Sequence, residues 1–236
     1  MQNNFDFIKG RNLYMQNQQQ GSMHENMHTG MVGQQMNHGG HELFDVHEVL
    51  SGAIGAMDQY TLLRPLVKDQ ELLGIMDRQY QFMQQEYNTT VDCFKTGQDP
   101  KVPTQSYEMT QGNDFVYGMK PSQPKKPIQN ASEITDACIS GLMLSAHKSM
   151  AGMKAKAACE VTNPVVRRVL ADSIPNCIEM AYELSVYQNK NHYYQVPQLA
   201  QQDMQQILNA YAPAQMNGQI TGQMTGQMQN PNTTTH

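Results

Sequence analysis

The sequence lacks long apolar runs and has little excess of charge of either sign. No segment approaches the roughly 20 consecutive apolar residues that a membrane-spanning helix needs, so we expect no membrane insertion. The 236 residues include 16 Lys and Arg against 21 Asp and Glu, a formal net charge of −5. Such a chain has no basic excess with which to hold nucleic acid. The first residues also lack the basic cluster and apolar core of a signal peptide, which predicts synthesis in the cytosol.

Cysteine pairs and catalytic motifs are also absent. The four cysteines, Cys93, Cys138, Cys159 and Cys177, are scattered without a C-x-x-C pair, which favours reduced side chains packed in a core. There is no G-x-S-x-G motif and no glycine-rich phosphate loop after a strand. We therefore expect a protein that is not an enzyme and binds no cofactor.

The two ends of the chain contain few branched aliphatic residues. Residues 1–40 and 212–236 are dominated by Gln, Asn, Gly, Met and Thr, and the second stretch contains a short Gly-Gln repeat that begins at Gly218. These compositions bury too little apolar surface to offset the entropy of ordering the chain, so both tails are predicted to be disordered. Residues 41–211 are left to form one folded module.

Apolar residues in this central part recur at spacings of three and four, which is typical of helices packed along their length. The pattern predicts helices at about 41–64, 70–96, 131–161 and 164–190. In the first helix, the line expected to be buried comprises Leu43, His47, Leu50, Ile54, Met57 and Thr61. In the third helix, it comprises Ile134, Cys138, Leu142, Ala146, Met150, Met153, Ala157 and Val161.

The expected helix ends carry residues suited to caps. Asp69 is a good N-cap for the second helix, and Gly97 stands where its C-cap is expected. Asn163 and Pro164 suit the N-cap and first position of the fourth helix. Pro175 falls inside that helix, removes one backbone hydrogen bond and predicts a kink. A short amphipathic segment at about 198–211 predicts a further short helix that caps the bundle.

A long connection separates the second and third helices. Residues 97–129 contain five prolines that do not suit a continuous helix: Pro100, Pro103, Pro121, Pro124 and Pro127. Extended, the segment could span about 100 Å, whereas a helix of about 28 residues is only about 42 Å long. The loop is therefore long enough to form the single long crossover of ferritin-like folds, although a slack antiparallel link would also fit.

Several short motifs stand out in the chain. The later ones are Glu160-Val161-Thr162-Asn163-Pro164, Arg167-Arg168, Ile178-Glu179-Met180 and Asn191-His192-Tyr193-Tyr194. The earlier ones are His47-Glu48-Val49-Leu50-Ser51 and Asp69-Gln70-Glu71-Leu72. Together they resemble the spore coat protein F family of endospore-forming bacteria, over roughly 41–196. The resemblance implies an all-α, ferritin-like four-helix bundle that is deposited in the spore coat as a structural component, with other coat proteins as partners. A homo-oligomer is left open.

The alternative is a ferritin-like protein that handles metal or transfers electrons. A di-iron centre needs Glu-x-x-His pairs on two helices and inward carboxylates on the others. The pairs are missing, because Glu179 is followed three places on by Tyr182 and no Glu precedes His147 at that spacing. We expect no metal, and the residues to examine for one are His47, Glu71, His147 and Glu179.

The first tail contains a literal H-E-x-x-H motif, from His24 to His28. Zinc proteases hold this motif on a rigid helix, whereas here it lies among glycines, so we interpret it as a chance match. A wider set of His and Met residues could bind a soft metal loosely. It comprises Met23, His24, Met27, His28, Met31, Met36, His38 and His41, and a biased tail without a ligand is the favoured interpretation.

The tails and the long loop also carry side chains that enzymes can cross-link. A glutamine amide can be joined to a lysine amine, and tyrosines can couple oxidatively, provided that the segments are flexible and accessible. The candidates are Tyr14, Tyr107, Tyr117, Lys125 and Lys126. Ordinary polar linkers with no covalent fate are the alternative.

Overall fold

The structure is a computed structural model that describes residues 38–214. Predictions that concern residues 1–37 and 215–236, including the H-E-x-x-H motif, Tyr14 and the Gly-Gln repeat, lie outside the described residues. The described part is helical, with one isolated bridge between Tyr117 and Val196, and this confirms the all-α class. None of its helices is both long enough and apolar enough to cross a bilayer.

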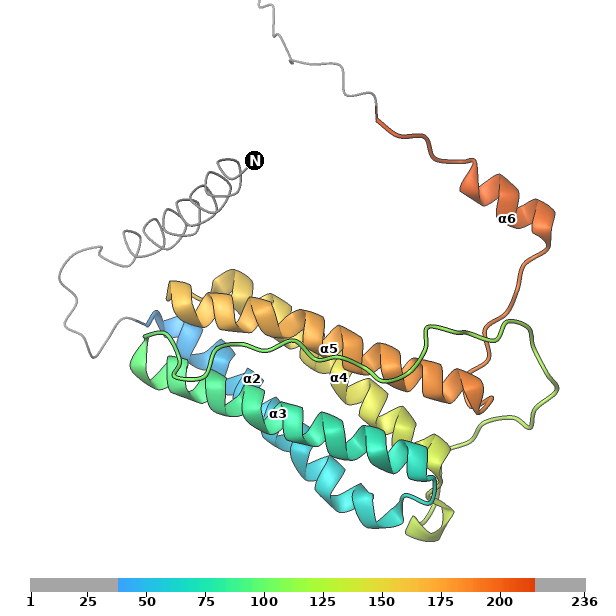
Figure 1. Ribbon diagram of the computed structural model, residues 1–236, viewed down its shortest axis with the longest axis horizontal. Coiled ribbons are helices and arrows are strands. Elements are labelled where there is room, and N and C mark those ends of the chain that lie inside the picture. The colour runs from blue at the N-terminus through green and yellow to red at the C-terminus, as the bar shows by residue number, and fades with distance from the viewer. Residues whose placement is uncertain (1–37, 215–236) are drawn as a thin grey trace, which may run out of the picture. The chain divides into compact units, whose positions relative to one another are not determined.

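The described part of the chain before Pro197 contains four long helices: α2 (Gly40–Leu63), α3 (Gln70–Thr96), α4 (Asp136–Glu160) and α5 (Pro164–Lys190) (Figure 1). Two short 3-10 turns, η1 (Arg64–Leu66) and η2 (Ala131–Glu133), precede α3 and α4. The predicted ranges agree closely, except that α4 begins at Asp136 and not at 131. Thr135 causes this later start, because its side chain accepts the backbone N–H of Cys138 and caps the helix.

The predicted caps are confirmed. The Asp69 side chain accepts the N–H of Glu71 at 2.8 Å. Gly97 ends α3 with a φ of 64°, a left-handed conformation that glycine adopts without strain. The Asn163 side chain accepts two N–H groups of the first turn of α5, and Pro164 occupies the first helical position. α5 continues through Pro175 as one helix, and a kink there stays a prediction.

Contacts at the helix ends fix the direction of the helices. The N–H of Lys68, just before α3, donates to Asp136 at the start of α4 at 2.9 Å, so these two helices begin at the same end. At the other end, the carbonyl of Gly97 accepts the side-chain N–H of Asn163, just before α5, at 3.2 Å. α3 therefore runs parallel to α4 and antiparallel to α5.

The first part of the connection 97–129 lies along α5, and the rest loops out and returns to the start of α4 (Figure 1). Three hydrogen bonds join it to successive positions of that helix: Thr104 to Asp172 at 2.9 Å, the N–H of Tyr107 to Asn176 at 2.9 Å, and the N–H of Val116 to Asn189 at 2.6 Å. The N–H of Gly118 then donates to the carbonyl of Val196 at 2.9 Å. Hydrogen bonds thus hold residues 104–118 against the bundle and the chain that follows it, and the flexibility of the loop stays a prediction.

The buried face of α2 differs from the predicted one. Leu43 and Ile54 are 46% and 43% exposed, and His47 is exposed as well. The buried residues stand one position away along the helix: Glu42, Val46, Val49, Ala56 and Tyr60. On α4, Leu142 is likewise 39% exposed although it was expected in the core. The predicted burial of cysteine holds for Cys93 and Cys177, whereas Cys138 is half-buried and Cys159 is exposed.

The chain from Gln198 onward forms a separate unit. It contains α6 (Gln201–Leu208), which lies within the predicted helical segment 198–211. The packing of this helix on the bundle, and the end of the folded module at 211, stay predictions.

Candidate functional site

A chain of hydrogen-bonded polar side chains lies inside the bundle, with one residue from each long helix. The hydroxyl of Tyr60 (α2) donates to Oε1 of Gln79 (α3) at 2.7 Å and lies 2.7 Å from Nε2 of His147 (α4). The Gln79 amide donates in turn to Oε2 of Glu183 (α5) at 3.0 Å. All four residues are at most 1% exposed. Because an unsatisfied buried polar group costs about 1–3 kcal/mol, this chain favours one arrangement of the four helices.

His147 acts in this chain as a neutral hydrogen-bond donor. The single hydroxyl hydrogen of Tyr60 goes to Gln79, so Nε2 of His147 carries a proton and donates to the Tyr60 oxygen. Burial, together with the nearby charge of Lys154, lowers the pKa of His147 to about 3. The imidazole is therefore uncharged at neutral pH and contributes to packing and hydrogen bonding in the core.

Glu183 joins the hydrogen-bonded side chains of the core to the long loop. Its carboxylate accepts hydrogen bonds from the Tyr107 hydroxyl, from the Arg78 guanidinium and, at 3.1 Å, from the N–H of Thr110. Tyr107 is only 6% exposed, and burial together with the Glu183 carboxylate raises the pKa of its hydroxyl. The expected accessibility of Tyr107 for oxidative coupling is therefore wrong, because this side chain is a buried hydrogen-bond donor.

A second buried charge lies further along the bundle. Lys154 on α4 is 4% exposed and forms an ion pair with Glu86 on α3, whose other oxygen accepts the Asn176 amide at 3.0 Å. Burial lowers the pKa of Lys154, but the Glu86 carboxylate outweighs this and leaves the pKa above its ordinary value. Lys154 therefore stays charged. It lines, with His147 and Cys177, a cavity of about 20 Å³, which is room for a single water.

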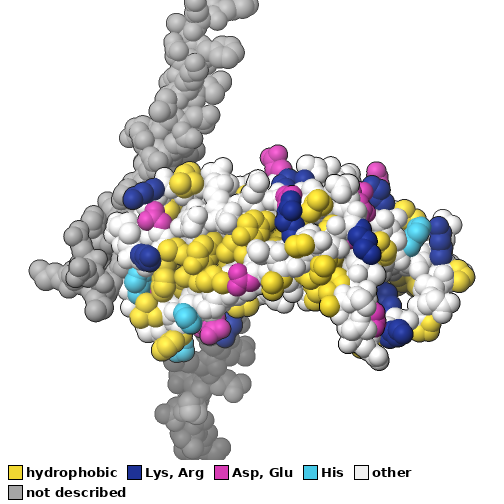
Figure 2. Space-filling view, turned by 90° about the horizontal axis from the view of Figure 1, so that it is seen from below, with side chains coloured by type: hydrophobic (Ala, Val, Ile, Leu, Met, Phe, Trp, Pro, Cys, Tyr) yellow, Lys and Arg dark blue, Asp and Glu magenta, His cyan; other side chains and the backbone are white. Residues whose placement is uncertain are grey.

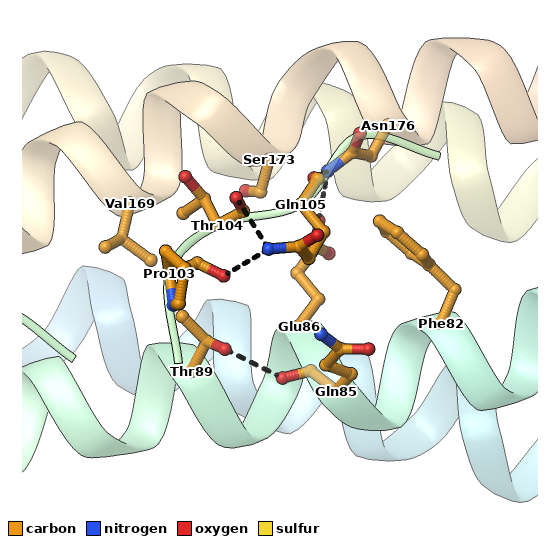
Figure 3. Close-up of a pocket in the computed structure, with 10 residues that line it drawn as sticks. All are labelled: Phe82, Gln85, Glu86, Thr89, Pro103, Thr104, Gln105, Val169, Ser173 and Asn176. Atoms are coloured by element: carbon orange, nitrogen blue, oxygen red, sulfur yellow. Dashed lines mark hydrogen bonds between the residues drawn. The ribbon is translucent and has the colours of Figure 1, made fainter. Parts of the chain in front are cut away.

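The space between residues 103–105 of the loop and the bundle is too small for a substrate. Figure 3 shows a cavity between Pro103 and Gln105 of the loop, Phe82 of α3, and Val169 and Asn176 of α5. Its volume is about 10 Å³, so it holds no more than one water. The loop is packed onto the bundle here and does not cover a binding pocket.

A larger open cleft of about 780 Å³ lies between residues 119–126, the first half of α4 and the residues after α5. Lys125, Lys126, Lys148 and His192 line it, and none of its lining residues is acidic. Lys125 donates to the carbonyl of Tyr193 at 2.7 Å. This volume lies within the usual range for binding clefts, and the basic lining suits an anionic group or an acidic peptide.

Three of the predicted cross-linking residues are accessible at or near this cleft. Tyr117 is 62% exposed, and Lys125 and Lys126 are also exposed.

Large apolar side chains are exposed elsewhere, on α2: Leu43, Phe44, Ile54 and Leu62. Figure 2 shows a band of hydrophobic side chains along one face of the bundle. Grouped apolar side chains of this kind are typical of contact surfaces.

The four predicted metal candidates do not come together. His47 is exposed on α2, and His147 is enclosed by Tyr60 and Gln79. Glu71 forms an ion pair with Lys190 at 3.0 Å. Glu179 is half-buried, and none of the four belongs to a group of metal-binding side chains among residues 38–214.

Sequence reasoning identified only His147 among the four hydrogen-bonded core residues and missed Tyr60, Gln79 and Glu183. Their signal is a polar residue at core spacing: Gln79 lies between Met76 and Met83, and Glu183 is next to Leu184 and three residues after Met180. A search for buried helical faces that counts only apolar residues passes over both.

Comparisons with known proteins agree with the motifs in α4 and α5. The family model of the Coat F domain matches residues 135–197. A curated relative, the spore coat protein F-like protein YhcQ of Bacillus subtilis (strain 168), is 55% identical over 177 residues. The alignment covers 75% of this chain and 82% of that relative. No solved structure matches.

Proposed function

The chain belongs to the Coat F family, and from this premise we propose that it is a non-catalytic structural component of the bacterial spore coat. The observation that carries the proposal is the 55% identity with a protein named as spore coat protein F-like. The proposal includes synthesis in the cytosol of the sporulating cell, deposition in the coat, and assembly with other coat proteins.

A ferritin-like bundle with a structural role is part of the same proposal. Two observations support it. α3 and α4 run parallel, and the loop that connects them lies along α5. The hydrogen-bonded group in the middle of the bundle, Tyr60, Gln79, His147 and Glu183, contains one carboxylate. That carboxylate is already held by Arg78 and Tyr107, and a di-iron centre needs several free carboxylates. This favours the structural role over the metal-handling alternative.

Localisation during sporulation tests the function. The full chain, fused to a fluorescent protein at its native locus, is expected to accumulate around the forespore and to remain with purified spores. A signal that stays diffuse in the mother cell, with no material in purified spores, would contradict the proposal. About two iron or manganese ions per chain, lost on changing Glu183 to Gln, would support the alternative function.

We place the contact with other coat proteins at the basic cleft. Lys126 and Lys148 line the cleft and are exposed, so they are available to an acidic segment of a partner. The double variant Lys126→Glu with Lys148→Glu is expected to fold normally and to lose accumulation at the forespore. Lys156→Glu is the matched control, because Lys156 is exposed on the same helix as Lys148 and does not line the cleft. Equal accumulation of the double variant and the control would exclude the cleft.

Covalent attachment through the exposed part of the loop is a further element of the proposal. Joining the Lys126 amine to a glutamine amide forms an amide bond and releases ammonia, and Lys126→Arg removes the reactive primary amine while keeping the charge. Mass spectrometry of digested mature spores is expected to show cross-linked peptides from residues 117–126 that decrease in this variant and persist in Lys156→Arg. Quantitative recovery of these peptides as unmodified linear species would leave noncovalent assembly only.

The division into a folded module at 41–211 and polar tails at 1–40 and 212–236 can be tested separately. A chain limited to residues 38–214 is expected to unfold in one cooperative transition, because the apolar helical faces lie inside this range. Loss of cooperativity relative to the full chain would show that a tail contributes to the core.

A further inference from the structure

Three side chains that commonly bind metals gather where the start of α2 meets the end of α4. His41 and Asp45 stand one turn apart on α2, and Glu160 is the last residue of α4. One potential ligand atom of each lies within 4.8 Å of the other two. Around a tetrahedral zinc ion with bonds of about 2.0–2.2 Å, neighbouring ligand atoms are about 3.4 Å apart. A metal site therefore requires side-chain rotations that shorten these separations, and the exposure of His41 and Glu160 leaves room for them.

A second, independent observation concerns an unpaired oxygen on one of the three side chains. Oδ2 of Asp45 is shielded from solvent and has no hydrogen-bond partner. Asp45 as a whole is half-buried, but a shielded oxygen without a partner is costly, and such an atom in a native structure calls for a proton, a water or a cation. Glu42, in the next position after His41, accepts the N–H groups of Thr162 and Asn163 and is not one of the three candidate ligands.

The donor set indicates the class of ion. Two carboxylates and one neutral imidazole carry a charge of −2 and balance a divalent cation. One nitrogen and two oxygen donors, with water completing the coordination, suit zinc and its first-row neighbours, whereas calcium prefers six to eight oxygen donors. We propose that His41, Asp45 and Glu160 form a site for one divalent transition-metal ion that ties α2 to α4, with zinc as the preferred occupant.

This site differs from a di-iron centre in place and in effect. It lies at the end of the bundle, where α2 begins and the turn between α4 and α5 follows. A bound ion would tie α2 to α4 beside the bonds of Glu42 to Thr162 and Asn163. The expected consequence is a rise in stability with metal concentration, because the ion binds the folded chain and not the dispersed ligands of the unfolded one.

Zinc titration of the full chain, purified without a histidine tag and stripped with a chelator, tests the proposal. Calorimetric titration with ZnCl₂ is expected to give one tight site per chain, and zinc is expected to raise the melting temperature. Asp45→Asn should weaken that site at least tenfold and abolish the rise. Without metal, Asp45→Asn should melt at or above the wild-type temperature, because it removes the charge from a carboxylate whose shielded oxygen has no partner. This reversal separates loss of the metal from simple damage to the fold.

Control variants exclude other ligands. His47→Ala changes an exposed histidine of the same helix, and the pair His24→Ala with His28→Ala removes the tail motif, so both should keep the tight site. With Co²⁺ in place of Zn²⁺, thiolate-to-metal absorption that vanishes in Cys159→Ser would assign the ion to the adjacent exposed cysteine and overturn the proposal. The proposal also fails if zinc leaves the wild-type melting temperature unchanged, or if Asp45→Asn shows the same zinc-dependent rise. These readouts are independent of localisation in the spore.

Discussion

Tyr107 donates its hydroxyl hydrogen to the carboxylate of Glu183, 76 residues later in the chain, and this bond fastens the long loop to the core of the bundle. Glu183 also accepts from Gln79 and Arg78, so one buried carboxylate serves both the packing of the helices and the docking of the loop. The two processes are therefore expected to be coupled.

Tyr107→Phe tests this coupling. The change removes one hydrogen bond to a charged acceptor, a loss of about 1.5–3 kcal/mol in the free energy of unfolding. Urea unfolding should show this loss, and limited proteolysis should cut faster within residues 97–129. Tyr117→Phe is the matched control, because Tyr117 is 62% exposed, and it should change stability by no more than about 0.5 kcal/mol. Equal stability of the two variants would mean that the loop docks without this bond.

Glu42 is expected to be the side chain that sets the register of α2. It is fully buried, and its Oε2 accepts the N–H groups of Thr162 and Asn163, each at 3.0 Å. Glu42→Gln replaces this charged acceptor by a neutral amide, and we expect a loss of about 1.5–3 kcal/mol in urea unfolding. Glu48→Gln, at an exposed position of the same helix, should leave stability within about 0.5 kcal/mol of wild type. A similar small change in both variants would contradict this role.

Helix ends could be predicted from the sequence because capping is local. Asp69, Gly97 and Asn163 satisfy backbone groups within three or four residues of themselves, so the neighbouring letters contain the necessary information. The buried face of α2 could not be predicted in this way. Apolar periodicity ranks Leu43 above Glu42 for burial. The backbone donors that satisfy the buried Glu42 carboxylate are about 120 residues away in sequence.

The candidate site was less predictable than the fold for the same reason. His147 was identified from its residue type, but its role depends on Tyr60 and Gln79, which are 87 and 68 residues away. The loop prolines correctly predicted a non-helical connection, yet they did not reveal that Tyr107 enters the core. Periodicity identifies which face of a helix is apolar, and only the folded chain shows which polar groups find partners.

Stability is expected to fall below pH 6.5 because of His147. In the folded chain burial lowers the pKa of His147 to about 3, whereas the unfolded value is about 6.5. Between these values only the unfolded state binds the proton, so the free energy of unfolding decreases as pH falls, by up to about 1.4 kcal/mol per pH unit. Above about pH 6.5 this contribution is fully present. Between pH 7 and pH 5, wild type should lose about 2 kcal/mol more than His147→Gln does.

The control for this pH dependence is His47→Gln, which changes an exposed histidine and should keep the wild-type slope. Apart from His47 and His147, the titrating groups are the same in wild type, His147→Gln and His47→Gln. Their effects therefore cancel when the slopes are compared. Urea unfolding at the two pH values gives the slopes directly. Parallel slopes for wild type and His147→Gln would show that the buried imidazole takes up its proton without loss of stability.

The pair formed by Lys154 and Glu86 should behave as one unit. Lys154→Met leaves the Glu86 carboxylate, whose side chain is only 13% exposed, without its cation, and we expect a loss of about 3–5 kcal/mol. Adding Glu86→Gln removes the uncompensated charge and should recover part of this loss. Urea unfolding of both single variants and the double variant gives the coupling energy, expected at about 0.5–3 kcal/mol. Strict additivity would show that the two charges are solvated separately, and Lys156→Met controls for the loss of an exposed lysine.

Replacing Pro175 by Ala should stabilise the protein. Proline lacks the N–H that would donate to the carbonyl of Ala171, and a proline inside a helix costs about 3 kcal/mol relative to alanine. The unfolded chain regains about 0.4–1 kcal/mol of flexibility in the variant, so the expected net gain is about 2 kcal/mol. Pro175 is exposed, and no core contact is lost. Pro164→Ala is the matched control, because at the first helical position proline costs no hydrogen bond and its removal should give no gain. If thermal unfolding shows no difference between the variants, the helix has already adapted to Pro175, and the carbonyl of Ala171 is satisfied without the missing donor.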